Sequence, residues 1–181
     1  MDIKSLERLE LDKILLSASG FAVLEDGKKK ILNCEPSTDV EEVRRLLECT
    51  AECDKILYTH GLGKIEQFSD VADNIERAAK GSALSCAELL DTNALLRSAR
   101  IAYDGISRIN DEDITIMRAK ADRLYFDRTL EDDISEKIIS SEQVSDFASD
   151  KLYSIRKQIR SLNERIRSKL ADYLTKDAKY L

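Results

Sequence analysis

The sequence predicts an all-α fold, a helical bundle followed by one long helix. Charged residues make up 35% and hydrophobic residues 43% of its 181 residues, with one proline and six glycines. Charged straight-chain residues lose little side-chain freedom in a helix, and few residues here would break one. Apolar residues recur at helical spacing, and no stretch has the pattern of a credible hairpin. We expect a helical domain over residues 1–148 and a single helix over residues 149–181.

The first helix is expected where Ile3, Leu6 and Leu9 begin a broad apolar face that continues to Leu15. Residues 17–30 break this pattern with two glycines, Gly20 and Gly27, and predict a turn, a short helix and a loop.

A well-delimited helix is predicted from Asp39. Pro36 disfavours helix at Glu35, and Asp39 can cap the helix with Glu42 as its capping-box partner. Gly61 can supply a left-handed cap at the far end. The expected buried stripe of this helix comprises Val40, Val43, Leu46, Leu47 and Leu57.

Four further helices are expected. One ends at Gly81, and the next begins at Ser85, where Glu88 completes a capping box, and runs to about Ile106. The starts of the other two are predicted at Asp111 or Asp113 and at Thr129. We interpret residues 140–149 as a loop that ends in Ser149, the expected cap of the final helix.

The final helix is basic in an otherwise acidic chain. Residues 151–174 carry seven Lys/Arg and two acids, a net charge of +5, whereas the whole chain is at −6. The acidic remainder disfavours nucleic acid, and the helix is left as the candidate surface for nucleic acid or a partner. No aromatic residue interleaves with the cations before Tyr173, so a solvated basic face is the alternative. The candidate cations are Arg156, Lys157, Arg160, Arg165, Arg167 and Lys169.

Apolar residues form a seam along the same helix. They follow 3-4-3-4 spacing for about two heptads and then continue, which is typical of a helix that pairs with another. Residues 151–174 would span about 36 Å at 1.5 Å per residue. The seam comprises Leu152, Ile155, Ile159, Leu162, Ile166, Leu170 and Tyr173.

No catalytic, cofactor or metal site is predicted. The only histidine, His60, stands in "HGLGK", where Lys64 is followed by Ile65 and the loop is too short for a phosphate-binding loop. Cys49 and Cys53 lie four residues apart, but a zinc site would need two more ligands from Cys34, Cys86 or His60. No apolar run reaches the roughly 20 residues of a membrane span, and the start does not resemble a signal peptide. We expect a cytoplasmic protein without membrane contact.

Four stretches of the sequence resemble the MutS-two family, the bacterial MutS paralogues that lack the mismatch-reading domains. They are "LERLELDKIL", "PSTDVEEVRRLLECTAE", "AAKGSALSCAELLDTNALLRSAR" and the closing "VSDFASDKLYSIRKQIRSLNERIRSKL" with "KYL". The resemblance covers essentially the whole chain and departs from the family pattern between about residues 103 and 133. In the closing match, Ala148-Ser149 stand where a loop of the family ends and a long helix begins, and Ile155-Arg156 stand where that helix carries an Ile-Arg pair.

The resemblance implies a MutS core followed by an outgoing lever helix that is truncated before the clamp. It implies no catalysis by this chain, with ATP and Mg expected only in a missing ATPase domain. The implied parent is an ATPase, possibly with Smr nuclease activity. It would form a homodimer and act on branched DNA, suppressing recombination, or on collided ribosomes. The alternative is a free-standing helical adaptor whose coiled-coil helix self-associates or recruits a partner.

Overall fold

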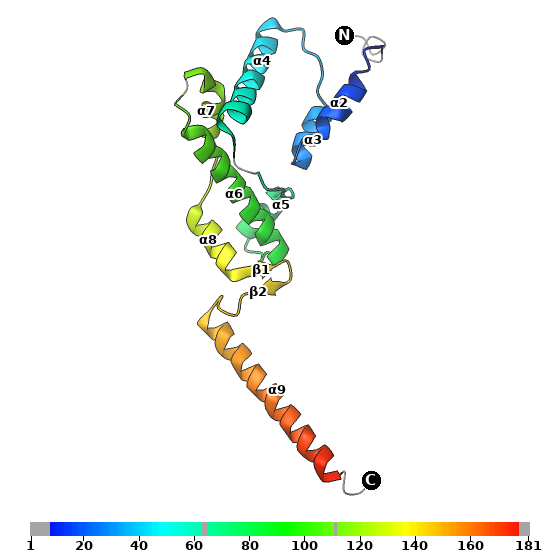
Figure 1. The fold of residues 1–181 in the computed structure, drawn as a ribbon, viewed down its shortest axis with the longest axis vertical. Coiled ribbons are helices and arrows are strands. Elements are labelled where there is room, and N and C mark those ends of the chain that lie inside the picture. Colours follow the sequence, from blue (N-terminus) through cyan, green and yellow to red (C-terminus); the bar gives the residue numbers. More distant parts are fainter. Residues whose placement is uncertain (1–7, 63–64, 111, 178–181) are drawn as a thin grey trace.

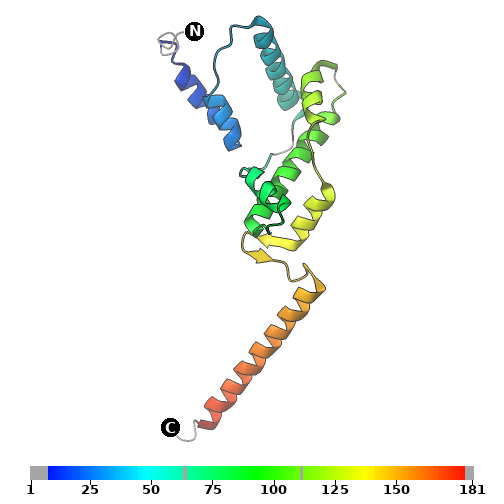
Figure 2. The same ribbon diagram turned by 180° about the vertical axis from the view of Figure 1, so that it is seen from behind.

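A computed structural model describes residues 8–62, 65–110 and 112–177, and the molecule is elongated, with the long helix at one end (Figure 1; Figure 2 from behind). The helices are α2 (Leu11–Ser19), α3 (Glu25–Leu32), α4 (Val40–Lys55), a π-helical turn η1 (Ile56–His60), α5 (Ala72–Ala79), α6 (Cys86–Ser107), a 3-10 turn η2 (Glu112–Ile114), α7 (Thr115–Ala121), α8 (Arg128–Lys137) and α9 (Asp150–Asp177). The prediction of an all-α fold is confirmed. No described helix is both long and apolar enough to cross a membrane.

Strands occupy only one short stretch of the described residues. β1 (Ile138–Ser140) and β2 (Gln143–Val144) pair antiparallel between α8 and α9. The sequence-based expectation of a plain loop without a hairpin was wrong here. The strands are too short to produce a readable alternation of apolar and polar residues, which is the signal that identifies a strand in a sequence.

Helices α2 and α3 pack against each other as a helical hairpin, and both views show this pair separated from α4 (Figures 1 and 2). Gly20 ends α2, as expected for the break in the pattern. Gly27, also expected to break helix, lies inside α3. Its backbone is helical because a single glycine weakens a helix by only about 1 kcal/mol.

The N-terminus of α4 has the predicted cap with a different partner. The Asp39 carboxylate accepts a hydrogen bond from the Glu41 amide at 3.0 Å. Glu42, predicted as the capping-box partner, instead accepts from the Ser37 hydroxyl. The preceding loop folds back and brings that hydroxyl within reach, so the capping-box prediction was wrong.

The predicted buried stripe of α4 is largely exposed. Val40, Leu46, Leu47 and Leu57 are between 49% and 64% exposed, because only the second half of α4 packs, and it packs on α7. The prediction of a left-handed helical cap at Gly61 was wrong in part, although Gly61 does have a positive φ of 71°, a region that favours glycine. Its ψ of 135° differs from the left-handed helical cap that was expected.

A small apolar core joins these elements. Ile56, Ile106, Ile109, Ile114 and Ala121 are buried together where η1, the end of α6, η2 and α7 meet. The expected helix start at Asp113 was wrong, since Asp113 lies in η2, and Asp111 lies outside the described residues. The first turn of α7 is capped from a distance: Glu52 on α4 accepts from the amides of Ile116 at 3.1 Å and Met117 at 2.7 Å.

Helices α6 and α8 are joined by a buried ion cluster. The Glu131 carboxylate, 5% exposed, accepts from Arg97 Nε at 3.2 Å and from Arg100 Nε and Nη2 at 2.8 Å each. The hydrogen bonds from Arg100, and then those from Arg97, hold the pKa of Glu131 below its usual value.

The Ser85–Glu88 capping box of α6 is confirmed. Helix α8 begins at Arg128, capped by Asp127, and not at the predicted Thr129.

Candidate functional site

The most distinctive feature of the molecule is α9, which extends away from the bundle, and no other helix of the described residues lies alongside it (Figures 1 and 2). Its 28 residues would span about 42 Å at 1.5 Å per residue. The predicted cap is confirmed, because the Ser149 hydroxyl accepts from the Leu152 amide at 3.2 Å. The division into domains at residues 148 and 149 stays a prediction, although α9 starts beside it.

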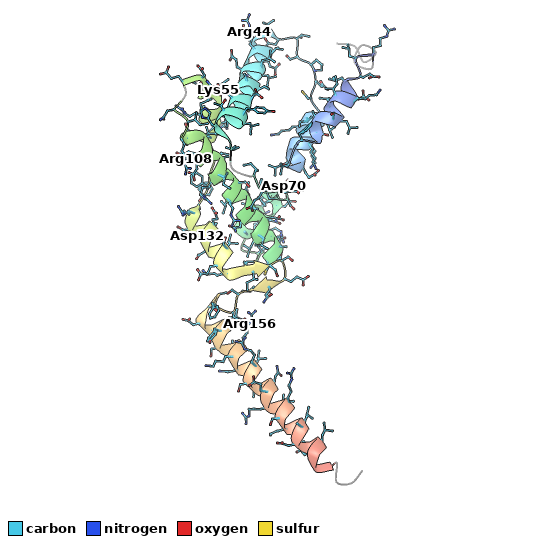
Figure 3. All side chains as sticks on the ribbon, in the orientation of Figure 1. Arg44, Lys55, Asp70, Arg108, Asp132 and Arg156 are labelled. Carbon is cyan, nitrogen blue, oxygen red and sulfur yellow. The ribbon has the colours of Figure 1, made fainter. Side chains whose placement is uncertain are left out.

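An ion cluster secures the base of α9 to the segment that precedes it. The Asp146 carboxylate accepts from Arg156 Nη1 at 2.5 Å and from Arg160 Nη1 at 2.8 Å. Arg156, labelled at the base of the helix in Figure 3, also donates to the carbonyl oxygen of Val144 in β2 at 2.9 Å. The hydrogen bonds from Arg160, and then from Arg156, lower the pKa of Asp146. Two turns of α9 are therefore tied to one carboxylate and one strand.

Aromatic packing and local hydrogen bonds reinforce the same joint. The rings of Phe147 and Tyr153 stack with centroids 5.4 Å apart and planes 19° apart. Ser145 is buried. Its hydroxyl oxygen accepts a hydrogen bond from the Phe147 amide at 3.2 Å, and its own amide donates to the Lys137 carbonyl oxygen at 2.8 Å. We call Ser145, Asp146, Phe147, Tyr153, Arg156 and Arg160 the elbow.

Beyond the elbow, the predicted seam is open to solvent. Leu152 is half-buried, and exposure then rises along the helix from 43% at Ile155 to 57% at Leu170 and 65% at Tyr173. Ile159, Leu162 and Ile166 lie between these values. The seam is one continuous apolar strip with nothing packed over its outer half in the described structure.

The six candidate cations fall into two groups. Arg156 and Arg160 bind Asp146 and belong to the elbow. Lys157, Arg165, Arg167 and Lys169 are exposed, and no ion pair of theirs is seen within the described part of the chain. Asp146 was missed because a single acid in a loop has no spacing that points to its partners.

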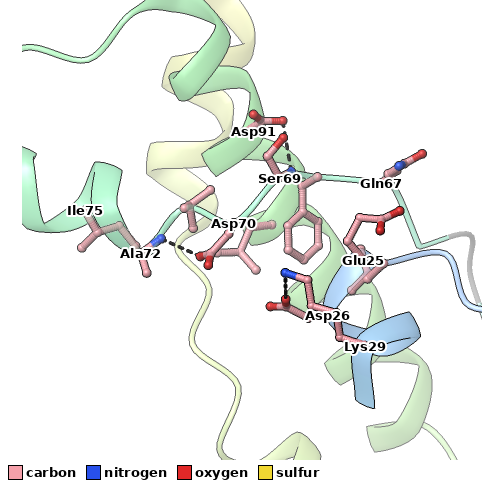
Figure 4. Close-up of a pocket in the computed structure, with 13 residues that line it drawn as sticks. Glu25, Asp26, Lys29, Gln67, Ser69, Asp70, Ala72, Ile75 and Asp91 are labelled. Carbon is pink, nitrogen blue, oxygen red and sulfur yellow. Dashed lines mark hydrogen bonds and ion pairs between the residues drawn. The ribbon is translucent and has the colours of Figure 1, made fainter. Parts of the chain in front are cut away.

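A groove lies on the body, between α3, α5, α6 and the segment before α5 (Figure 4). Its volume is about 760 Å³, and its apolar lining includes Leu24, Phe68 and Leu95. Four carboxylates line it against one lysine: Glu25, Asp26, Asp70 and Asp91, with Lys29. Asp91 accepts from the Ser69 amide at 3.4 Å and Asp70 from the Ala72 amide at 3.0 Å. An acidic groove of this kind disfavours a phosphate backbone.

The remaining sequence motifs stay separate from α9. His60 ends η1 and lines a shallow pocket with Arg100 and Asp104, whereas Lys64 of "HGLGK" lies outside the described residues. Across the described ranges, no three His, Cys, Asp or Glu side chains gather in a way that could hold a metal ion.

Comparison with known proteins shows which proteins the chain resembles. No family model matches it. It is 34% identical over 182 residues to the endonuclease MutS2 of Clostridium perfringens strain SM101, covering 100% of this chain and 23% of that protein. It is 36% identical over 172 residues to the endonuclease MutS2 proteins of Clostridioides difficile and Geobacillus thermodenitrificans, covering 94% of this chain and 22% of each. The chain thus spans less than a quarter of the length of these relatives, and over nearly all of its own length it is similar to one segment of these MutS2 proteins.

Proposed function

We propose that this chain is the core-and-lever module of a MutS2 protein, with α9 as the outgoing lever. One observation carries the proposal: α9 projects from the body, and the described contacts that hold it lie at its base, in the elbow. A lever has to be stiff along its length and firmly joined at the end where motion enters. A continuous helix supplies the first property, and the Asp146 ion pairs with the Phe147–Tyr153 stack supply the second.

The surface of the chain supports a role inside a larger assembly. Its accessible area is 14263 Å², whereas a compact monomer of 20.5 kDa exposes about 8,900 Å². The excess includes large apolar side chains on α2, α4 and α9. Exposed apolar faces of this kind mark surfaces that pack against another protein or another part of the same protein. In the proposed lever, a helix from a later segment of the longer protein would run back alongside α9 and cover the seam.

Within this proposal, the chain is a mechanical part and not an enzyme. ATP and Mg would be held by an ATPase domain of the longer protein, and any nuclease activity would also lie outside these residues. The whole protein would work in the cytoplasm as a homodimer on branched DNA, on collided ribosomes or on both. Lys157, Arg165, Arg167 and Lys169 are the cations free to face such a polyanion, which binds basic surfaces in a salt-dependent manner.

The elbow provides the test. Spin labels carried by unnatural amino acids at Glu136 on α8 and Ser168 on α9 would report the angle between body and helix. We expect one narrow distance distribution for the unsubstituted protein, and a broad one for Asp146→Asn, because the amide cannot pair with both arginines. The matched control is Glu164→Gln, which removes an acid from the exposed part of α9 and should leave the distribution narrow.

Two results would contradict the lever proposal. A broad distribution in the unsubstituted protein would mean that the elbow does not hold α9. An unchanged distribution in Asp146→Asn would mean that the ion cluster plays no part. In the full-length protein, Asp146→Asn should reduce the stimulation of ATP hydrolysis by branched DNA while leaving unstimulated hydrolysis unchanged.

The open seam favours a second candidate, a helical adaptor that self-associates or recruits a partner through α9. The two candidates differ in what the seam binds: a later segment of the same chain in the lever, and a separate molecule in the adaptor. The self-association experiment in the Discussion tests the adaptor, because a seam that never binds a second molecule excludes it.

A further inference from the structure

Three sulfur atoms from helices α4 and α7 lie close to one another in the body of the molecule, far from α9 in sequence. The Sδ of Met117 on α7 lies 3.4 Å from Cys53 Sγ and 3.9 Å from Cys49 Sγ on α4. The two thiols also interact with each other. We propose that Cys49, Cys53 and Met117 form a binding site for a monovalent soft metal ion, with Cu(I) as the ligand. This site is independent of the lever function.

The distances suit three-coordinate binding. With metal–sulfur bonds of about 2.3 Å, a trigonal site places its sulfur atoms roughly 4 Å apart. The two separations in the structure, 3.9 Å and 3.4 Å, would have to open by about 0.1 Å and 0.6 Å to meet that value. Side-chain rotation alone supplies such a change, because Met117 has three rotatable bonds and a polarizable thioether.

The protein holds these sulfurs in place with hydrogen bonds that lie beside them. Cys49 and Cys53 stand four residues apart and therefore share a face of α4 on consecutive turns. Glu52, next to Cys53, accepts from the amides of Ile116 and Met117 and so pins the start of α7 against α4. Met117 also packs against the apolar core. Partners of this kind orient metal ligands and tune their affinity.

The charges around the site suit a monovalent cation. Two thiolates and one Cu(I) leave a net charge of −1, and Lys120 Nζ lies 3.4 Å from Cys49 Sγ, where it can neutralise this charge. Burial, and then the neighbouring Cys49, raise the pKa of Cys53. Glu52, the acidic residue next to Cys53 in sequence, already accepts hydrogen bonds from two backbone amides.

The donor set selects Cu(I) over zinc. Thiolate and thioether sulfurs are soft ligands that prefer Cu(I), whereas structural zinc takes four ligands from cysteine, histidine or carboxylate. In the described part of the chain no third such residue joins Cys49 and Cys53. All three sulfur residues are half-buried, so an ion can reach them from solvent.

The test is a titration of the reduced chain with Cu(I) in competition with bicinchoninate, under anaerobic conditions. We expect one Cu(I) per chain. Met117→Leu, which conserves volume, should weaken binding about tenfold or more, since even the loss of a group that only hydrogen-bonds to a metal ligand weakens metal sites by that factor. Cys49→Ser and Cys53→Ser should weaken it further. Cys34→Ser and Cys86→Ser are the matched controls and should leave affinity unchanged.

X-ray absorption of the Cu(I)-loaded unsubstituted chain gives a readout that does not depend on any variant folding. We expect three sulfur ligands at about 2.3 Å. Two sulfur ligands, equal affinity in Met117→Leu, equal affinity in Cys49→Ser, or no competition with bicinchoninate would each overturn the proposal, leaving the cluster as packed thiols.

Discussion

Glu52 is a buried carboxylate that caps a helix from 64 residues away in sequence, and its loss should destabilise the junction of α4 and α7. It is 8% exposed, and its two oxygens accept from the amides of Ile116 at 3.1 Å and Met117 at 2.7 Å. These are the second and third residues of α7, whose amides have no partner within a helix. Glu52→Ala therefore leaves two donors without their acceptor.

The expected cost follows from the two hydrogen bonds. Removing a side-chain cap costs about 0.5–2 kcal/mol, and a hydrogen bond to a charged group contributes about 1.5–3 kcal/mol. Removing a buried charge recovers part of this loss. We therefore expect Glu52→Ala to lower the free energy of unfolding by about 2–4 kcal/mol. Glu48→Ala, one turn earlier on the exposed surface of α4, should change it by no more than about 0.5 kcal/mol.

Urea denaturation followed by circular dichroism measures the free energy of unfolding, with the urea dependence checked for equality between variants. Hydrogen exchange gives a local readout, because the amides of Ile116 and Met117 should lose protection in Glu52→Ala and keep it in Glu48→Ala. If both variants had the same stability and the same exchange at these amides, the distant cap would contribute nothing and the reasoning would be wrong.

Three other measurements test separate parts of the structure. Glu131→Gln should lower stability at pH 7 by about 1–3 kcal/mol; because folding depresses the pKa of Glu131, this difference should shrink as the pH falls below about 4.3, and a constant difference in urea titrations would contradict it. Sedimentation should show salt-strengthened self-association through the seam, since burying each such side chain contributes about 1.5–3 kcal/mol, and Ile166→Glu should abolish it. Nucleic-acid binding by α9 would instead weaken with salt. A protein that stays monomeric at high concentration in low and high salt would refute the adaptor. Calorimetry should detect no ATP binding, since the sequence has no phosphate loop; saturable binding in the micromolar range would overturn this.

The sequence by itself determined those features whose partners are close along the chain. The capping box of α6 joins Ser85 to Glu88, and the cap of α9 joins Ser149 to Leu152, so each is visible as a spacing of three residues. Gly61 and Gly81 both have a positive φ, and both stand where the apolar periodicity of a predicted helix stops. The all-α class and the seam of α9 follow in the same way, because helical periodicity repeats every few residues.

Only the tertiary structure decided which periodic faces are covered and which polar groups meet. The stripe of α4 has the same apolar spacing as a buried face, yet most of it is exposed because α7 is short and covers only the second half. Asp146 meets Arg156 and Arg160, and Glu131 meets Arg97 and Arg100, through turns that bring distant residues together. Cys49 and Cys53 gain Met117 as a third sulfur for the same reason. Periodicity records that a side chain is apolar, whereas burial and pairing depend on where the chain returns in space.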